Sequence, residues 1–261
     1  MGENVLKFGT YVRVGNAAEA YELLQKNRNN KIVGGGIWMR LGSRRVATAI
    51  DLSACGLDQI EETETEFRIG AMCTLRQLER HAGLNALVNN VFEFAVHDIV
   101  GVQLRNTATV GGSIYGRFGF SDVLTMFLAL DASVELYKGG IVPLCEYAER
   151  KKDRDVLVRV IVPKKAGARF DYRSVRPTRT DLPTLTCASV REGDGCRFVI
   201  GSRPARAMIF TPEAGSAEQM AEQVQREAVL GSNMRGSAAY RRKLVGTLVR
   251  RAAEALENTA E

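Results

Sequence analysis

The residues best suited to binding chemistry lie at positions 105–114, where two consecutive glycines stand between Thr109 and Ser113. Paired glycines let a backbone come close to a ligand and take positive φ, and nearby hydroxyl and N–H groups can face an anion. Asp122 follows nine residues after Ser113, and its carboxylate could accept hydrogen bonds from a sugar hydroxyl. The combination favours a site for a diphosphate-bearing nucleotide, although a tight turn between two core elements would also explain the glycines.

A second glycine cluster strengthens the nucleotide hypothesis. The apolar, strand-like residues 31–33 lead directly into Gly34, Gly35 and Gly36. This is not the dinucleotide fingerprint of the doubly wound fold, because the glycines precede Ile37 and Trp38 rather than an opening helix in a G-x-G-x-x-G pattern. Two glycine loops separated by a whole α/β segment predict a ligand held between loops.

The elements expected around these loops follow from hydrophobic periodicity. A helix capped by Asn16 should precede the first loop, Thr74 and Gln77 should form a capping box, and Ser121 should cap a later helix. We expect helices at 17–24, 75–80, 84–96 and 123–130, and strands at 46–52, 67–72, 132–137, 140–143 and 156–162.

A change of pattern falls at residues 163–167. Beyond it, three strands are expected at 169–176, 184–191 and 197–202, followed by helices. Apolar residues recur four apart in the last helix, which predicts a core-facing stripe made of Tyr240, Leu244, Leu248 and Ala252.

The two loops are similar to those of the flavin-binding subunit of molybdenum hydroxylases, the family that includes xanthine and carbon monoxide dehydrogenases. That family carries A-G-G-T-D-L in the first loop and R-N-x-A-[ST]-[IV]-G-G-N-I in the second, followed by an Asp and an L-A-L-D-A-x-V-E-L segment. The chain matches at residues 33–38, 105–114, 122 and 128–136, and again at 156–163, 170–173 and 235–242. It departs from the family pattern at Gly36 and Ile37, which replace Thr-Asp, and at Ser113, which replaces Asn.

The resemblance implies an α+β fold with two domains. A two-lobed FAD-binding domain of the vanillyl-alcohol-oxidase/PCMH type would span residues 1–164, and a small domain of a three-stranded sheet plus helices would span 165–261. It implies FAD as the cofactor, and the absence of His and Cys from both loops favours a non-covalent link. The residues expected to bind FAD are Lys31, Ile32, Val33, Gly34, Gly35, Gly36, Ile37, Ile99, Thr109, Val110, Gly111, Gly112, Ser113, Asp122, Leu157 and Arg173.

The function implied by the resemblance is electron relay in an oxidoreductase. Electrons would pass from [2Fe-2S] clusters on a small subunit through FAD to an acceptor such as NAD, while a large molybdopterin-binding subunit hydroxylates the substrate. The chain itself would carry no catalytic residue and no metal. Two alternatives remain open, namely a scaffold subunit that has lost flavin and a stand-alone flavoenzyme of the PCMH type.

Composition limits the remaining function classes. No apolar run reaches the length of a transmembrane helix and the first residues lack a signal-peptide layout, so we expect a cytoplasmic protein that does not bind membranes. The five cysteines are dispersed without a C-x-x-C motif, which argues against a cluster or metal site in this chain. The net charge of +6 is spread over several groups of arginines without interleaved aromatic residues, so a nucleic-acid partner is not expected.

Overall fold

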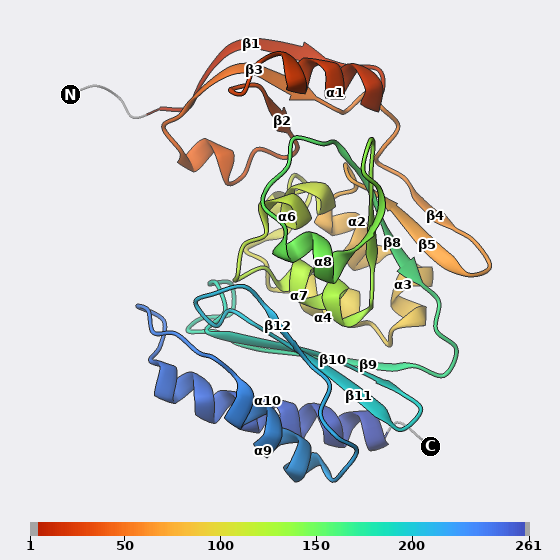
Figure 1. Ribbon diagram of the computed structural model, residues 1–261, viewed down its shortest axis with the longest axis vertical. Coiled ribbons are helices and arrows are strands. Elements are labelled where there is room, and N and C mark those ends of the chain that lie inside the picture. The colour runs from red at the N-terminus through yellow and green to blue at the C-terminus, as the bar shows by residue number, and fades with distance from the viewer. Residues whose placement is uncertain (1–4, 259–261) are drawn as a thin grey trace. The chain divides into compact units, whose positions relative to one another are not determined.

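The computed structural model describes residues 5–258 and divides them into two compact, interleaved units (Figure 1). The first unit contains residues up to Gln77 together with Val102–Gly116 and Ala132–Val162. The second contains Leu78–Gly101, Arg117–Asp131 and the chain from Pro163 onward. The predicted domain boundary between residues 164 and 165 stays a prediction.

The N-terminal part of the first unit is a small parallel sheet with one helix. Strands β1 (Lys7–Arg13), β3 (Arg45–Asp51) and β2 (Lys31–Val33) lie in that order, so β3 is central. Helix α1 (Ala17–Lys26) begins at the predicted cap, where the Asn16 side chain accepts from the backbone of Glu19. Its buried Ala20 and Leu24 pack with Ile50 of β3 into a core, and a short 3-10 turn, η1 (Met39–Leu41), follows the first glycine loop.

The rest of the first unit is built on a five-stranded sheet in the order β4-β5-β8-β6-β7. The predicted capping box forms at the start of α2, because the Thr74 hydroxyl and the Gln77 side chain each accept from the other residue's backbone N–H. The strands of this sheet are β4 (Ile60–Glu62), β5 (Glu66–Gly70), β6 (Ser133–Leu136), β7 (Gly140–Pro143) and β8 (Leu157–Pro163). The helices of this part are α2 (Leu75–Arg80, whose last turn belongs to the second unit), α5 (Val102–Arg105), α6 (Val110–Gly116) and α8 (Leu144–Glu149).

The second unit is an antiparallel sheet covered by helices on both faces (Figure 1). The three predicted strands form as β9 (Arg169–Val175), β10 (Leu185–Glu192) and β11 (Gly195–Gly201), and a fourth, β12 (Met208–Phe210), joins the edge. The expected three-stranded sheet therefore has four strands among the described residues. One face carries α9 (Ala217–Glu227) and α10 (Ala238–Asn258), and the other carries α4 (Val91–His97) and α7 (Asp122–Ala129).

Two expected helices of the second unit differ in the structure. The helix predicted at 84–96 is split into α3 (Ala82–Leu87) and α4, because Asn89 and Asn90 take positive φ values of 50° and 62° and end the first helix. In α10, Leu248 and Ala252 are buried as expected, whereas Tyr240 is 46% exposed at the beginning of the helix.

Ser121 caps α7 as predicted, accepting from the backbone N–H of Leu124 at 3.1 Å.

Candidate cofactor-binding site

The first glycine loop leaves β2 and packs directly on the second loop within the first unit. A Cβ at Gly34 would lie 2.5 Å from Thr109 Oγ1, and a Cβ at Gly35 would overlap the carbonyl of Thr107. Gly36 has φ +67°, a conformation that L side chains rarely adopt. The three glycines are therefore needed for loop-to-loop contact and for the turn.

Three backbone N–H groups of the first loop have no hydrogen-bond acceptor in the described part of the chain. The N–H groups of Gly35, Gly36 and Ile37 donate to no acceptor within residues 5–258, although all three residues are half-buried. Buried backbone donors are nearly always satisfied, so an open row of them next to a positive-φ glycine is suited to an anionic oxygen. Lys31, at the start of β2, and Arg40, just after the loop, add positive charge along the chain on either side.

The second glycine loop differs from expectation, because it is the first turn of helix α6. Neither Gly111 nor Gly112 has positive φ, so the positive-φ role expected of this pair is wrong. All four N–H groups from Val110 to Ser113 already have protein acceptors: Cys73 O at 2.8 Å, Ala71 O at 2.8 Å, Thr109 Oγ1 at 3.1 Å and Thr109 O at 3.0 Å. This loop supports the first loop, with Thr109 only 5% exposed between them.

Close packing explains one glycine of the second loop. A Cβ at Gly111 would lie 2.7 Å from both the Cβ and the carbonyl oxygen of Ala71, whereas Gly112 is exposed and its added Cβ would meet only Thr109 Oγ1 at 3.0 Å. Ala71 in turn donates to Val158 O of β8 at 2.9 Å. The predicted residue Leu157 precedes that position and is 6% exposed in the sheet core.

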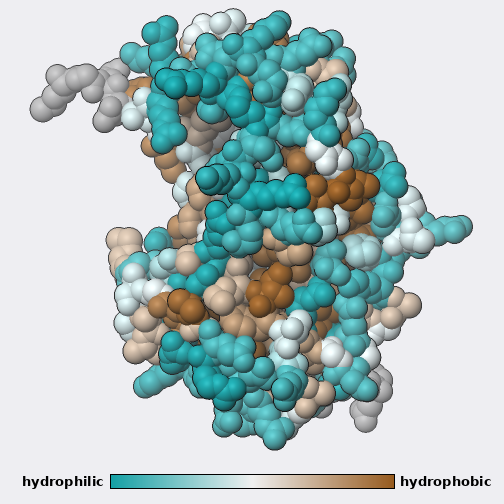
Figure 2. Space-filling view, viewed as in Figure 1, coloured by the Kyte–Doolittle hydropathy of each residue, from teal (hydrophilic) through white to brown (hydrophobic). Residues whose placement is uncertain are grey.

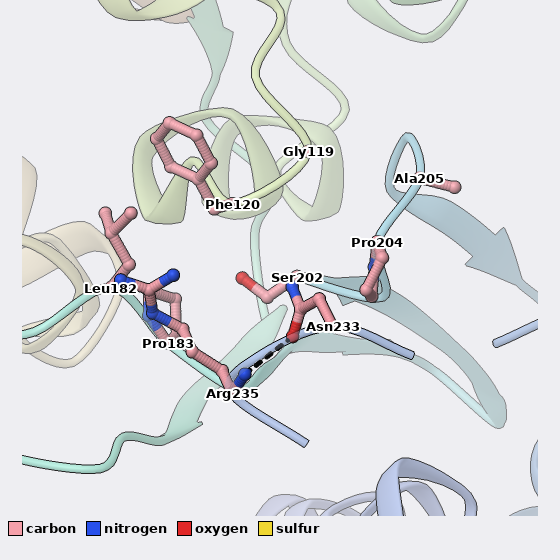
Figure 3. A pocket seen from close by; sticks show the side chains of 9 residues that line it. All are labelled: Gly119, Phe120, Leu182, Pro183, Ser202, Pro204, Ala205, Asn233 and Arg235. Carbon is pink, nitrogen blue, oxygen red and sulfur yellow. Dashed lines mark hydrogen bonds between the residues drawn. The ribbon is translucent and has the colours of Figure 1, made fainter. Parts of the chain in front are cut away.

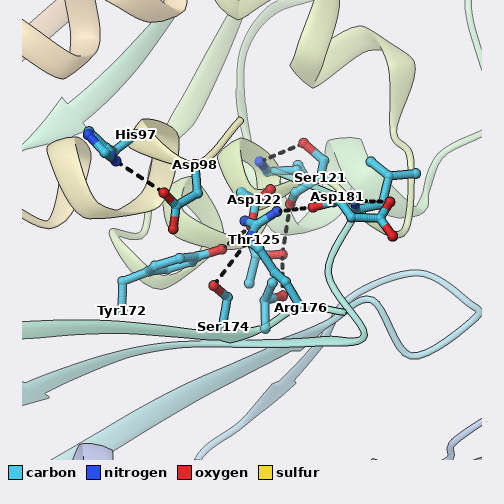
Figure 4. A network of polar contacts seen from close by, with 12 residues as sticks. His97, Asp98, Ser121, Asp122, Thr125, Tyr172, Ser174, Arg176 and Asp181 are labelled. Carbon is cyan, nitrogen blue, oxygen red and sulfur yellow. Dashed lines mark hydrogen bonds and ion pairs between the residues drawn. The ribbon is translucent and has the colours of Figure 1, made fainter. Parts of the chain in front are cut away.

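The second unit contains Asp122 in a buried polar network (Figure 4). Asp122 is 4% exposed at the first turn of α7, and its Oδ1 accepts from the Tyr172 hydroxyl and from Arg176 Nη2. Arg176 also donates to the carbonyl of Asp181 at 2.7 Å and to Ser174 Oγ at 3.3 Å. The carboxylate predicted to bind a sugar hydroxyl is thus engaged with protein donors.

Burial controls the protonation of this network. Desolvation raises the pKa of Asp122 to about 6, in opposition to the Arg176 guanidinium and the Tyr172 hydroxyl, which lower it. Desolvation and the Asp122 carboxylate together raise the pKa of Tyr172 well above its ordinary value. Tyr172 therefore stays a hydrogen-bond donor at neutral pH.

The other predicted residues of the second unit make different contacts. Ile99 is half-buried just after α4, and its N–H donates to Val96 O at 2.9 Å. Arg173 on β9 forms a two-pronged ion pair with Asp171, at 2.7 and 3.1 Å. The roles of Tyr172 and Arg176 were not predicted, although Tyr172 lies within the matched segment 170–173 and Arg176 follows it by three residues.

The second unit also holds a cavity of about 290 Å³ (Figure 3). None of the predicted cofactor residues lines it, and its walls come from Gly119, Phe120, Leu182, Pro183, Ser202, Pro204, Ala205, Asn233 and Arg235. Ser202 is 5% exposed with φ +57°, and its hydroxyl has no partner in the described part of the chain.

Comparison with known proteins identifies the family. The model of the FAD binding domain in molybdopterin dehydrogenase matches residues 6–165. The chain belongs to this family. Its relatives include protein YgfM of Escherichia coli K12, 27% identical over 251 residues that cover 92% of this chain and 93% of YgfM. Another is the carbon monoxide dehydrogenase medium chain of Afipia carboxidovorans, 27% identical over 282 residues that cover 94% and 95% of the two chains.

Solved structures agree on the fold. A chain of carbon monoxide dehydrogenase from Hydrogenophaga pseudoflava superposes with a TM-score of 0.85 at 23% identity, covering 96% of this chain and 97% of that one. The α+β fold, with an FAD-binding domain and a C-terminal sheet domain, is therefore as expected.

Family membership also fixes the class of activity. The chain is an FAD-binding oxidoreductase subunit of the molybdenum hydroxylase type. All five cysteines are free thiols, and no group of three or more potential ligands for a metal occurs within residues 5–258. No helix in that range is long and apolar enough to span a bilayer.

Proposed function

We propose that this chain holds FAD non-covalently and relays electrons from [2Fe-2S] clusters to an acceptor such as NAD. In this proposal it works beside a large molybdopterin-binding subunit and a small [2Fe-2S] subunit. Support comes from the family match and from relatives that carry the names of a medium chain and an FAD-binding subunit. A cytoplasmic location stays a prediction.

The observation that carries the proposal is the row of open N–H donors at Gly35, Gly36 and Ile37. A diphosphate offers several acceptor oxygens, which three N–H groups can bond. Its negative charge is matched by Lys31, which precedes the loop in the sequence. When bound, the flavin accepts electrons singly and delivers them as a pair, and the protein supplies binding, orientation and electrostatics.

Other residues of the site have distinct proposed tasks. Ile32 and Val33 are half-buried at the end of β2 and would form an apolar wall, while Thr109 fixes the spacing of the two loops. Val110, Gly111, Gly112 and Ser113 would act through this support rather than by offering N–H groups, since those groups are already bonded. Roles for Leu157, Ile99, Asp122 and Arg173 beside the flavin remain proposals that rest on the resemblance.

Release of the chromophore tests the proposal. The purified chain should be yellow with a flavin absorption spectrum, and acid precipitation should transfer the colour to the supernatant because no covalent link exists. Colour that stays in the pellet would contradict non-covalent binding. A colourless native complex would contradict flavin binding itself.

One observation favours a competing function. Gly36 and Ile37 lack the polar side chains of the family's Thr-Asp, which fits a scaffold subunit that has lost its flavin. Such a subunit would assemble with its partners but would stay colourless. A stand-alone flavoenzyme, the other alternative, would oxidise or reduce a substrate of its own without any partner subunit.

A further inference from the structure

The positive charge of this protein is concentrated in its N-terminal sheet. Residues 5–50 contain eight Lys and Arg and two Glu, a formal charge of +6 that equals the net charge of the whole chain. The eight cations are Lys7, Arg13, Lys26, Arg28, Lys31, Arg40, Arg44 and Arg45. The next segment, residues 51–66, contains six acids and no Lys or Arg.

One acid of the sheet lies beside these cations, since Asp51 stands opposite Arg13 in the register of β1 and β3 and accepts from the Tyr11 hydroxyl. All eight are exposed, and none forms an ion pair with any residue in the range 5–258. A ninth cation joins them, because Arg154 donates to the carbonyls of Asn27 and Arg28 at 2.8 and 3.0 Å. Burial, followed by the charges of Arg154 and Arg44, lowers the pKa of Lys31. Figure 2 shows hydrophilic side chains over this part of the surface.

Two of these cations stand side by side at one edge of the sheet. In the parallel register Lys7 stands beside Arg45, so two like charges share one face, and Arg44 precedes the pair. Every residue of the edge strand β1 except Val12 is exposed, including Phe8 at 44% and Tyr11 at 60%. We name Lys7, Phe8, Tyr11, Arg44 and Arg45 the basic edge.

Two simpler explanations account for only part of this surface. Charges on an edge strand discourage sheet-to-sheet aggregation, but Arg44 lies outside a strand and Arg45 belongs to the central strand β3. The FAD diphosphate would face Lys31 and Arg40 beside the first glycine loop, and the charge of Arg44 also acts on Lys31, so Lys7 and Arg45 are the cations of the basic edge that this explanation leaves unpaired. Arginine and exposed aromatic residues together are typical of protein interfaces.

We propose that the basic edge docks the acidic face of the [2Fe-2S] protein that donates electrons to this chain. The inference takes its donor from the proposed function and adds the surface on which it binds. A cluster held by Cys thiolates carries net negative charge, and charge complementarity both steers the encounter and fixes orientation. Asp51 ends β3 and stands opposite Arg13, whereas Lys7 and Arg45 stand at the other end of the paired strands and form no ion pair with a described residue, so that end of the sheet stays positive in the free chain.

The test uses the full chain and an acidic [2Fe-2S] ferredoxin as the probe, titrated calorimetrically at several ionic strengths. The variant Lys7→Gln/Arg44→Gln/Arg45→Gln should bind about tenfold more weakly at low salt, with a shallower dependence on salt. The matched control is Arg226→Gln/Lys243→Gln/Arg251→Gln, which removes three exposed cations that form no ion pair with described residues of the second unit. It should bind the probe as the unaltered chain does.

Several outcomes would overturn the docking proposal. They are equal weakening by both triple variants, no weakening by the basic-edge variant, no binding of ferredoxin at low salt, and tighter binding of a DNA oligonucleotide or of a second copy of the chain. Thermal unfolding gives an independent measurement, since removal of Lys7 beside Arg45 should leave the melting temperature unchanged or raise it. Flavin content is read separately from visible absorbance, so loss of the proposed cofactor and loss of docking are distinguishable.

Discussion

At Gly35 the absence of one methyl group decides whether the two glycine loops can meet. A Cβ there would overlap the carbonyl of Thr107, which is backbone and cannot rotate away. We expect Gly35→Ala to displace the first loop, to cost ~1–3 kcal/mol in the free energy of unfolding, and to lose most of the flavin. Urea unfolding and the flavin-to-protein absorbance ratio measure the two effects.

Gly15→Ala is the matched control for that substitution. Gly15 is exposed just before α1, has no positive φ, and its new Cβ would lie 3.9 Å from a side-chain oxygen of Glu19, an ordinary contact. The control should keep its flavin and nearly all of its stability. Equal flavin loss in both variants would contradict a specific role of the first loop in cofactor binding.

Arg176 compensates the buried charge of Asp122. The side chains of this ion pair are 7% and 5% exposed, and removal of one member leaves the other charge desolvated. We expect Arg176→Met to cost ~3 kcal/mol at pH 8, measured by urea unfolding. Arg173→Met, which breaks a pair whose Arg side chain is 30% exposed, should cost less than about 1 kcal/mol.

The pH dependence of the Arg176 variant follows from the raised pKa of Asp122. A folded pKa of about 6 exceeds the usual 3.8, so the folded state binds more protons between those values. The contribution of Asp122 is therefore greatest at low pH and is lost as the pH rises to about 6. Without Arg176 the pKa rises further, so the variant's loss of stability should be smaller at pH 5 than at pH 8. A loss independent of pH would contradict this assignment.

Residue types in the sequence indicated the contacts of the site better than their hydrogen-bonding roles. Glycine pairs mark close approach, and close approach is found at Gly34, Gly35 and Gly111. The sequence did not indicate which N–H groups stay open, because that depends on distant acceptors such as the carbonyls of Ala71 and Cys73. Asp122 was identified, but its partners on β9 and just beyond it, brought there by tertiary packing, were not.

At the scale of elements, one buried arginine anchors α10 to the sheet of the second unit. Arg241 is fully buried and donates to the carbonyls of Thr184, Gly231 and Gly236 and to Asn233 Oδ1. This explains the matched segment 235–242 as a structural motif. The Arg241 guanidinium binds backbone carbonyls rather than an acid, so loss of this side chain leaves several buried acceptors unpaired.

We expect Arg241→Met to lower the free energy of unfolding by at least ~3 kcal/mol, since each orphaned acceptor costs ~1–3 kcal/mol. Arg241→Lys should recover little of the stability lost in Arg241→Met, because an ammonium group cannot reproduce the planar, forked hydrogen bonding of a guanidinium. Arg242→Met serves as the control, because Arg242 is exposed and donates only to the carbonyls of Gln225 and Ala228. Urea unfolding of the three variants measures the differences, and equal losses at both positions would refute the anchoring role.

Elements with local stop and start residues were predicted well. The caps at Asn16, Thr74 and Ser121 form as expected, because each side chain needs only a backbone N–H three residues away. Helix α6 was missed because two glycines in its first turn have poor helix propensity, and tertiary contacts compensate for it. Strand β12 was missed because three residues give too short a pattern to detect.

At the scale of the whole molecule, sequence order and spatial order diverge. The α+β class follows from the family resemblance, and the order of most elements follows from local periodicity. The division into units does not, because residues 78–101 and 117–131 belong with the C-terminal sheet although they lie within the N-terminal half of the chain. Such pairing of distant segments depends on long-range packing that no local pattern contains.

The isolated chain should catalyse only the half-reaction that needs the flavin alone. The described residues contain no cluster of potential metal ligands, and burial raises the pKa of Cys187 and of Cys73, so neither thiol is a nucleophile at neutral pH. We therefore expect the lone flavin-loaded chain to pass electrons between a reduced nicotinamide and an artificial dye, and to leave purines, nicotinate and similar heterocycles unchanged. Hydroxylation, followed by liquid chromatography, should appear only after the molybdopterin and [2Fe-2S] subunits are added back. Turnover of a heterocycle by the chain alone would show that it has a substrate site of its own and is not a relay.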